Sequence, residues 1–300
     1  MNSPRYLDED EVRRHLRMAD LIPAMEKALI DFSAGKVIQP VRSVIAVDPP
    51  GGFFGMMPAL ADGLGIKIVT FYPPNAERGI PTHMATIFLV DRETGAPLAV
   101  MDGRLITEMR TAAVSAAATK LLASRDAKVL AILGSGVQAG SHMEALRLVR
   151  DFQEIRVWSP NAEHAQRFAK EIGAKAMAAE AAVRDADVVV TCTSSKMSIL
   201  QGAWLKPGCH VNAVGACRPD WRELDDEAMA NVVFVDSREA AMKESGDVIL
   251  SRATVHAELG EALAGKIDHR ANETTIFKSL GMAVEDIAAA MLVYRAVAGA

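Results

Sequence analysis

Residues 134–139, Gly-Ser-Gly-Val-Gln-Ala, directly follow a short, mostly apolar run at 128–133, and their types and spacing have the clearest chemical meaning in the chain. They fit the pattern G-x-G-x-x-A between a strand and a helix, which is typical of dinucleotide-binding proteins. Gly134 permits a tight turn, Gly136 lets a pyrophosphate approach the backbone, and Ala139 lets the helix pack close to the strand. The segment therefore predicts a dinucleotide site at a helix N-terminus, and a glycine turn without a ligand is the alternative.

The next expected strand ends in Trp-Ser-Pro-Asn at 158–161, where such a fold recognises the adenosine ribose. An acidic residue there favours NAD and a nearby arginine favours NADP, but neither is present. Ser159 and Asn161 can form hydrogen bonds with either cofactor, so the sequence leaves the choice open. Thr191 and Thr193 follow a later strand and are candidates for ribose or phosphate contacts, with a self-capping Ser/Thr turn as the alternative.

Isolated basic side chains interrupt apolar stretches of the first third of the chain. They are Arg42, Lys67, His83 and Arg110. Each one taken alone has about even odds of lying on a solvated face. If they converge, they form an anion site, because arginine grips a carboxylate in bidentate fashion and burial tunes the pKa of a lysine. Spacing alone does not show that they converge.

The first group of elements that would position these residues mixes helix and strand. Residues 8–32 have helical spacing, and runs at 43–47, 65–71 and 86–90 favour strands. The run at 97–101 is expected to form a hairpin with 86–90, and a helix follows as far as residue 123. The candidate buried positions of the first helix are Val12, Leu16, Leu21, Met25 and Leu29.

From residue 126 onward, strand and helix patterns alternate. Strands are expected at 128–133, 155–158, 188–191, 210–214 and 232–235, with helices between them that include 162–172. This alternation predicts right-handed crossovers and an open parallel sheet. The tail from residue 274 onward is expected to be one long helix that starts near Ser279, which would cap it.

The composition narrows the class of protein. At about 150 residues per domain, 300 residues suggest two domains. With 33 basic and 38 acidic residues the net charge is −5, which argues against nucleic acid as a partner. No stretch reaches the about 18 apolar residues of a membrane span, and the first residues offer no apolar signal core. Three cysteines without zinc-site spacing complete the expectation of a cytoplasmic protein with reduced thiols.

No metal site is expected either, because no constellation of metal-binding residues is visible. Three of the histidines outside the first third lie in patterns of surface helix or loop: His142, His164 and His269.

Several segments together resemble the ornithine cyclodeaminase/mu-crystallin family over nearly the whole chain. They are residues 65–67, 89–95, 101–103, 107–113, 134–139 and 212–216. The resemblance implies an α/β homodimer with an α+β substrate-binding and dimerisation domain, residues 1–120, completed by a C-terminal helix, residues 282–300. A Rossmann-type, doubly wound dinucleotide-binding domain at 121–281 would lie between them. The implied ligands are NAD(H) or NADP(H) and a small imino or amino acid.

The resemblance also implies roles for particular residues. Arg42, Lys67 and Arg110 would hold the substrate carboxylate, with Thr82 and His83 beside it. Lys67 is the first candidate for the acid that protonates the substrate, and His83 is the second. The cofactor contacts that we expect are Arg110, Thr111, Gly134, Gly136, Val137, Gln138, Trp158, Ser159, Asn161, Thr191, Thr193, Val214 and Ser279.

At one position the chain departs from the cyclodeaminases and alanine dehydrogenases of the family, and this difference helps to choose between the possible reactions. Cyclodeaminases and related alanine dehydrogenases have an aspartate at the position of Cys217, which would contact the substrate here. The string Arg-Pro-Asp-Trp-Arg-Glu-Leu at 218–224 is similar to the mu-crystallin branch, whose members reduce ketimines. A thiol is a poor base at neutral pH, although Asp220 could take over that role.

We therefore expect NAD(P)H-dependent reduction of a small imino acid to an L-amino acid. Δ1-Pyrroline-2-carboxylate, Δ1-piperideine-2-carboxylate or a linear 2-imino acid would be the substrate. Ornithine cyclodeamination with bound NAD+ and non-catalytic binding of NADPH or another small ligand are the alternatives.

Overall fold

The computed structural model describes residues 3–267 and 272–299. The chain divides into two compact units, one formed by the residues up to Arg110 together with those from Met282 onward, and the other by Thr111–Gly281. Helix α3 (Arg104–Leu122) contains the point where the chain passes from the first unit to the second, and the expected boundary at residue 120 lies in the same helix. In the described part of the chain, no helix is long and apolar enough to cross a membrane.

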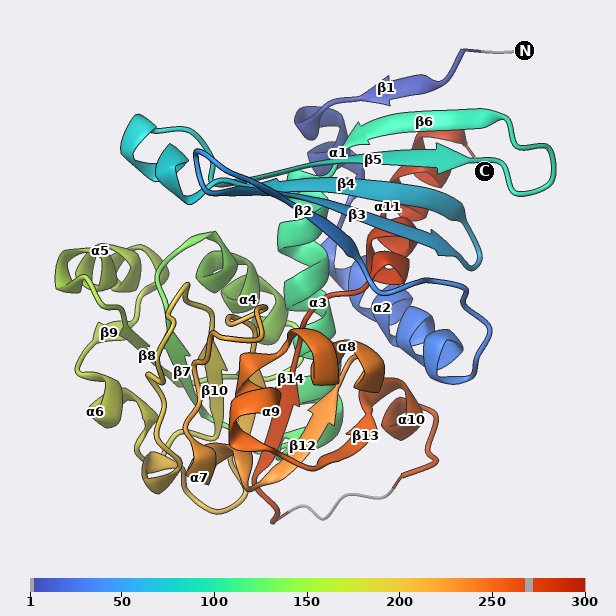
Figure 1. Cartoon of the computed structure of the whole chain (residues 1–300). Helices are drawn as coiled ribbons and strands as arrows, with labels where there is room; N and C mark the ends of the chain where they lie inside the picture. The colour runs from blue at the N-terminus through green and yellow to red at the C-terminus, as the bar shows by residue number, and fades with distance from the viewer. Residues whose placement is uncertain (1–2, 268–271, 300) are drawn as a thin grey trace. The chain divides into compact units, whose positions relative to one another are not determined.

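The first unit is built on a six-stranded sheet in the order β1-β6-β5-β4-β3-β2 (Figure 1). Its strands are β1 (Arg5–Leu7), β2 (Ser43–Val47), β3 (Gly52–Leu60), β4 (Leu64–Phe71), β5 (His83–Val90) and β6 (Pro97–Asp102). Neighbours are antiparallel except β1 and β6. The expected hairpin of β5 and β6 is confirmed, whereas β3 escaped sequence analysis because two glycines and a proline interrupt its pattern.

Helices cover one face of this sheet. They are α1 (Glu9–His15), α2 (Met18–Ser33) and α11 (Ala283–Ala298), and a short 3-10 helix, η1 (Pro73–Arg78), joins β4 to β5. The single helix predicted at 8–32 is two helices, because Leu16 and Arg17 adopt extended backbone conformations. All five of its candidate buried residues are buried. Figure 1 shows α11 lying against the sheet beside α2, so the C-terminal helix completes the core of the first unit.

The second unit contains an eight-stranded sheet in the order β13-β12-β14-β11-β10-β7-β8-β9, and every neighbouring pair is parallel. The strands are β7 (Val129–Leu133), β8 (Glu154–Trp158), β9 (Lys175–Ala176), β10 (Val188–Thr191), β11 (His210–Ala213), β12 (Val232–Val235), β13 (Val255–Glu258) and β14 (Thr275–Lys278). The predicted parallel sheet is confirmed. The chain proceeds outward from β7 through β8 and β9, then returns to the other side of β7 at β10. In open α/β sheets, ligands bind beyond the carboxyl ends of the strands at such a reversal.

One prediction for this unit is wrong. Residues 275–278 were expected to belong to a long C-terminal helix, but they form β14, between β11 and β12. All four residues of β14 are buried, and the helix begins only at Ala283, with Met282 as its N-cap. Ser279 lies between the two elements and does not cap the helix.

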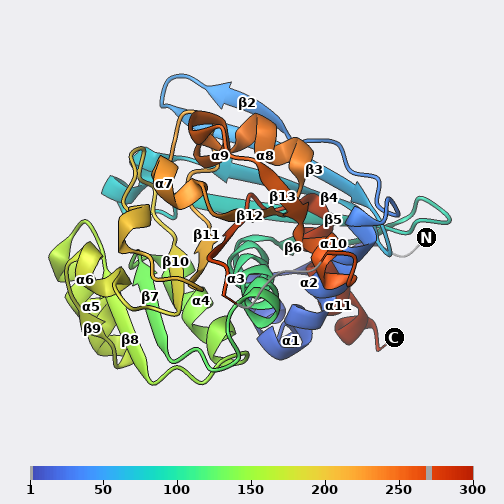
Figure 2. The same ribbon diagram turned by 90° about the horizontal axis from the view of Figure 1, so that it is seen from below.

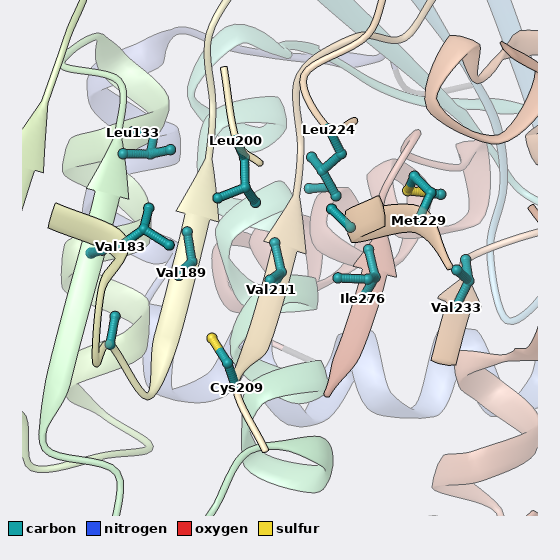
Figure 3. Close-up of a cluster of buried hydrophobic side chains, with 14 of the residues drawn as sticks. Leu133, Val183, Val189, Leu200, Cys209, Val211, Leu224, Met229, Val233 and Ile276 are labelled. Atoms are coloured by element: carbon teal, nitrogen blue, oxygen red, sulfur yellow. The ribbon is translucent and has the colours of Figure 1, made fainter. Parts of the chain in front are cut away.

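The helices of the second unit flank its sheet. They are α4 (Val137–Arg147), α5 (Ala162–Ile172), α6 (Ala179–Val183), α7 (Asp226–Met229), α8 (Arg238–Glu244), α9 (Gly246–Ser251) and α10 (Leu259–Leu263), with a 3-10 turn, η2 (Gly202–Trp204). Figure 2 shows α5 and α6 beside β8 and β9 at one edge. In Figure 3, Leu133, Val189, Val211 and Ile276 project to the same side from four neighbouring strands into a buried apolar cluster. Apolar layers on a parallel sheet explain why its strands could be recognised as continuous apolar runs.

Candidate active site

Lys67 is buried, with 2% of its side chain exposed. It lies on β4 directly opposite Ile87 of β5, which is also buried, so both side chains point to the sheet face that the helices cover. A lysine in a strand has to be compensated electrostatically if it faces the core. Its partners therefore define the site.

Two carboxylates of α11 provide that compensation. The Asp286 carboxylate lies 2.6 Å from the Lys67 ammonium and accepts a hydrogen bond from Nε of Arg110 at 3.0 Å. Nη1 of Arg110 donates to Glu285 at 2.7 Å. Lys67, Arg110, Glu285 and Asp286 form what we call the Lys67 cluster, in which no side chain is more than 5% exposed. Sequence analysis missed both acids, although two adjacent carboxylates at the start of an otherwise apolar helix are a signal.

The electrostatics of the cluster bring the pKa of one group, Lys67, close to neutral pH. Burial lowers the pKa of Lys67 to about 8, since the opposing charge of Asp286 only partly offsets burial and the charge of Arg110. Burial also raises the pKa of Asp286, but the charges of Arg110 and Lys67 outweigh it and hold this carboxyl below its ordinary value. Burial, Lys67 and Arg110 lower the pKa of His83 to about 4. His83 is therefore a neutral imidazole at neutral pH, while Lys67 can hold or release a proton.

Other predicted substrate residues lie near this cluster in the first unit. Arg42 comes just before β2 and is half-buried, and its charge also lowers the pKa of Lys67. His83 is the first residue of β5. Thr82 precedes it, and the Thr82 carbonyl accepts a hydrogen bond from the Tyr72 N–H at 2.7 Å, which ties down the backbone at the start of the strand. Arg42, Lys67, His83 and Arg110 thus share one electrostatic neighbourhood, which spacing could not show.

The glycine loop of the second unit follows β7 and leads into α4. Gly134 has φ of 140°, and a Cβ there would lie 2.7 Å from Cys192 Sγ, so a larger residue does not fit. At Gly136, by contrast, no atom of the described residues would lie within 4 Å of an added Cβ. Gly136 is the N-cap of α4, and the described side chains provide no cap for this helix. The N-terminus of α4, with Val137 and Gln138 in its first turn, is therefore open to an anion.

The end of β8 is joined to this loop by hydrogen bonds. The Trp158 carbonyl accepts from the Gly134 N–H at 2.8 Å, and Ser159 Oγ lies 2.9 Å from Ser135 Oγ. Asn161 caps α5, because its Oδ1 accepts from the first-turn N–H groups at 2.9 and 3.1 Å. These contacts fix the strand end where the ribose of a dinucleotide is expected.

The hydroxyls of Thr191 and Thr193 form hydrogen bonds beyond their own turn. Both hydroxyls donate to the carboxylate of Glu223, at 2.7 and 2.6 Å. Glu223 is fully buried and is a third acidic residue that sequence analysis missed. Its role is visible only in the fold, because it lies 30 residues or more from both threonines.

Among the buried side-chain atoms of the second unit that have no hydrogen-bond partner in the described part of the chain are Ser279 Oγ and Gln138 Oε1. Ser279 follows β14 and is 1% exposed. Val214 follows β11, and its N–H donates to the Thr191 carbonyl at 2.8 Å. Thr111, on α3, is also buried.

Cys217 and Asp220 lie in the loop after β11, and both are exposed. The Cys217 thiol lies 3.5 Å from the Val214 carbonyl, which keeps it beside the carboxyl end of the strand. Asp220 belongs to a turn in which the Trp221 N–H donates a hydrogen bond to the Arg218 carbonyl at 3.1 Å.

The prediction for His142 is wrong. Its ring is fully buried, with Nε2 2.9 Å from Ser115 Oγ and Nδ1 2.7 Å from the Gln138 carbonyl, and burial lowers its pKa to about 4. His164 is exposed on α5, and His269 lies outside the described residues. Within residues 3–267 and 272–299, no group of three or more His, Cys, Asp and Glu side chains is placed to hold a metal ion.

Comparison with known proteins adds independent findings. The sequence profile of the ornithine cyclodeaminase/mu-crystallin family matches residues 4–300. The chain is 50% identical to the ketimine reductase mu-crystallin of Mus musculus, with 97% of each chain covered. It is 36% identical to a Δ1-pyrroline-2-carboxylate reductase of Bacillus cereus, with 96% and 95% covered.

Solved structures show the same similarity. The Δ1-pyrroline-2-carboxylate reductase of Thermococcus litoralis, solved with NADH and L-proline, superposes with a TM-score of 0.92 at 36% identity and 98% coverage of both chains. An archaeal alanine dehydrogenase dimer with bound NAD superposes with a TM-score of 0.93 at 34% identity, covering 99% of this chain and 96% of the other.

Proposed function

The chain belongs to the ornithine cyclodeaminase/mu-crystallin family, and from this premise we propose that it reduces a small imino acid to an L-amino acid with NAD(P)H. The observation that carries the proposal is the buried Lys67 beside Asp286, with its pKa lowered to about 8. Similar proteins support it, because they include a ketimine reductase and a pyrroline-2-carboxylate reductase solved with NADH and L-proline.

The second unit fits a dinucleotide. The open space beside Gly136 and the uncapped N-terminus of α4 suit a pyrophosphate, and both lie at the strand reversal next to β7. The unpartnered hydroxyl of Ser279 offers a hydrogen bond to the nicotinamide end. When bound, NAD(P)H supplies the hydride, and the protein supplies binding, orientation and the proton.

The first unit would hold the substrate by its carboxylate. Arg42 and Arg110 are the guanidinium groups near Lys67, and a bidentate arginine contact would fix the orientation of the imino acid. Arg110 is itself held by Glu285 and Asp286, so its guanidinium is oriented before the substrate binds. Such preorganisation lowers the entropic cost of placing the C=N carbon for hydride transfer.

Lys67 would keep the substrate nitrogen protonated. An iminium carbon accepts hydride far better than a neutral imine carbon, and an acid works best when its pKa is near the working pH. Lys67 meets this condition, whereas the pKa of about 4 leaves His83 without an acidic proton at neutral pH. His83 is then better suited to a neutral hydrogen bond with the substrate.

The residue type at position 217 argues against a lyase, as the family resemblance implies. Cyclodeamination needs a base at the amine, and the position that carries an aspartate in cyclodeaminases is the thiol of Cys217 here. Asp220, the alternative base, is exposed in its turn. The reductase therefore remains the first candidate for the reaction.

The test uses the purified full-length chain with NADH or NADPH and a series of imino acids: Δ1-pyrroline-2-carboxylate, Δ1-piperideine-2-carboxylate and a 2-oxo acid mixed with an amine. We expect the absorbance of the reduced nicotinamide to fall, with formation of the L-amino acid. Parallel reactions with ornithine and NAD+ report cyclodeamination as released ammonia. Binding of the cofactor without turnover of any imino acid would reject the reductase and favour a binding protein.

We further propose that two copies of the chain associate through the outer face of the six-stranded sheet. Residues that alternate with Lys67 and its neighbours point away from the helices and are largely apolar. The apolar ones include Ile45, Phe54, Met56, Ile66, Ile68, Met84, Phe88 and Val100, and Ser43, Thr70 and Thr86 lie on the same face. Ile45, Ile68 and Met84 are between 37% and 54% exposed, and an apolar sheet face of this kind suits a self-complementary interface.

Sedimentation measurements on the native chain and on Ile68→Glu test this association. We expect a dimer for the native chain and a shift towards monomer for the variant. Met197→Glu, at an exposed apolar residue of the second unit, is the matched control and should sediment like the native chain. A native chain that sediments as a monomer, or an Ile68→Glu variant that stays fully dimeric, contradicts the proposal.

A further inference from the structure

We propose that Glu223, with Lys278 and Asp247, forms a buried charge network that positions the nicotinamide-side loops and favours the oxidised cofactor over the reduced one. The network would thereby make the bound NAD(P)H a stronger hydride donor. This inference rests on the nicotinamide cofactor of the proposed function and does not depend on which imino acid is the substrate.

Glu223 binds two loops through its carboxylate. Oε1 accepts from the N–H and the hydroxyl of Thr193, both at 2.6 Å, just after β10. Oε2 accepts from the Thr191 hydroxyl at 2.7 Å and from the Gly215 N–H at 2.8 Å, just after β11. A Cβ at Gly215 would lie 2.4 Å from the Glu223 carboxyl carbon, so the carboxylate lies directly against the loop backbone.

Lys278 and Asp247 extend the network to a third strand. Lys278 is the last residue of β14 and is fully buried; its ammonium donates to the Gly215 carbonyl and lies 2.9 Å from the Asp247 carboxylate. Asp247, also fully buried, accepts from the N–H groups of Glu223 and Leu224 at 2.7 and 3.0 Å. The carboxyl ends of β10, β11 and β14 are therefore tied together.

The charge of the network follows from its members. Two carboxylates and one ammonium give a formal charge of −1 when all three are ionised. Burial raises the pKa of the Glu223 carboxyl above its ordinary value, and Lys278 and the hydrogen bonds of Thr193 and Thr191 offset only part of that rise. Each oxygen of Glu223 faces one backbone N–H that can only donate, which suits the ionised carboxylate.

The place of the network in the sheet connects it to the cofactor. The glycine loop after β7 would take the pyrophosphate and the end of β8 the adenosine ribose, so the nicotinamide half falls on the side of β10, β11 and β14. Ser279, whose hydroxyl lacks a partner among the described residues, directly follows Lys278. The loops that Glu223 holds are thus the ones that would flank the nicotinamide.

A fixed negative charge at that end has a definite consequence. The nicotinamide ring is cationic in NAD(P)+ and neutral in NAD(P)H. A buried carboxylate interacts with the cation more strongly than it would in water, since the local dielectric constant is low. It therefore stabilises the bound oxidised form relative to the reduced form, which is the direction that hydride donation to the substrate requires.

Calorimetric titration of the full-length chain with NAD+ and with NADH measures this effect without turnover. For Glu223→Gln, which keeps the shape but loses the charge, we expect the ratio Kd(NAD+)/Kd(NADH) to rise about 3- to 10-fold. Glu223→Asp keeps the charge, so its ratio should stay within about twofold of the native value even where both affinities fall. A purely structural role would weaken both ligands equally.

Asp247→Asn removes one unit of negative charge on the other side of Lys278, so we expect the same rise in Kd(NAD+)/Kd(NADH) as for Glu223→Gln. If one of these two variants fails to fold, the other still tests the proposal. An unchanged ratio in the folded variants overturns the proposal, and so does a fall in the ratio. If the native protein binds both cofactors but turns over no imino acid, the proposed reductase activity is rejected. The ratio Kd(NAD+)/Kd(NADH) of the variants still tests the charge network in that case. If it binds neither cofactor, both proposals fail.

Discussion

Replacing Asp286 by asparagine should move the alkaline limb of the pH–rate profile to lower pH. In the native chain, the Asp286 carboxylate lies 2.6 Å from the Lys67 ammonium and keeps the lysine pKa as high as about 8 against burial and two arginines. Unit charges at that separation attract by about 6 kcal/mol at an effective dielectric of 20, but measured pairs of this kind shift a pKa by about 1–3 units. We therefore expect the limb to fall from near pH 8 to about pH 5–7.

The rate at fixed pH follows from that shift. At about pH 7.5, a lysine with a pKa of 8 is about three-quarters protonated, whereas a pKa of 7 leaves about one quarter and a pKa of 6 about 3%. The acid-dependent rate should therefore drop about 3-fold if the limb moves to pH 7, about 25-fold if it moves to pH 6 and about 240-fold if it moves to pH 5, and it should recover towards acid pH. The assay is kcat/KM for imine reduction between about pH 5 and 9.

Folding of the variant needs its own measurement. Breaking a buried ion pair typically costs about 3–5 kcal/mol, so thermal unfolding is followed in parallel. The control is Asp62→Asn, which breaks a solvent-exposed pair at 2.8 Å to Arg295 on the same helix, α11. This control should lose at most about 1 kcal/mol and keep the native profile. An Asp286→Asn enzyme that folds and retains its limb near pH 8 would refute the assignment of Lys67 as the titrating acid.

Three further predictions follow from individual residues. Lys67→Met should lower imine reduction at least about 100-fold while NADH affinity, measured by fluorescence titration, stays within about twofold; substantial residual activity would assign the proton elsewhere. Gly136→Val should leave the melting temperature unchanged because the space beside it is open, yet weaken NADH binding about tenfold or more, and unchanged affinity would move the pyrophosphate away from this loop. His142 is neutral in the fold, because burial lowers its pKa to about 4 from its ordinary 6.5. Its contribution to the free energy of unfolding is therefore complete above about pH 6.5 and is lost as the pH falls towards 4, by up to about 3 kcal/mol. Urea unfolding at several pH values should show a smaller acid loss for His142→Gln, and equal pH dependence in the two proteins would contradict this.

Local sequence sufficed wherever a function depends on adjacent residues. The strand, the glycine turn and the start of α4 are contiguous, and each glycine answers a backbone requirement, so the loop could be predicted without a fold. The parallel strands were recognisable because burial on both faces demands continuous apolar runs. The same rule failed at β14, where Thr-Ile-Phe-Lys contains a buried lysine that hides the strand and precedes a genuine helix.

The partners of the charged residues could be identified only from the tertiary structure. Spacing identified Lys67 and Arg110, but not the carboxylates of Glu285 and Asp286, which lie more than 170 positions along the chain from Arg110. Glu223 was missed for the same reason. A charge acquires its pKa and its function from neighbours in space, and in both units those neighbours come from distant strands and helices. The sequence by itself determined the glycine loop, most strands of the parallel sheet and the types of reactive group, because these depend on local conformation and periodic burial. Which groups are paired, which proton is mobile and which hydroxyl is already engaged was decided only by folding, because electrostatic and hydrogen-bond energies depend on distances of a few ångströms between remote segments.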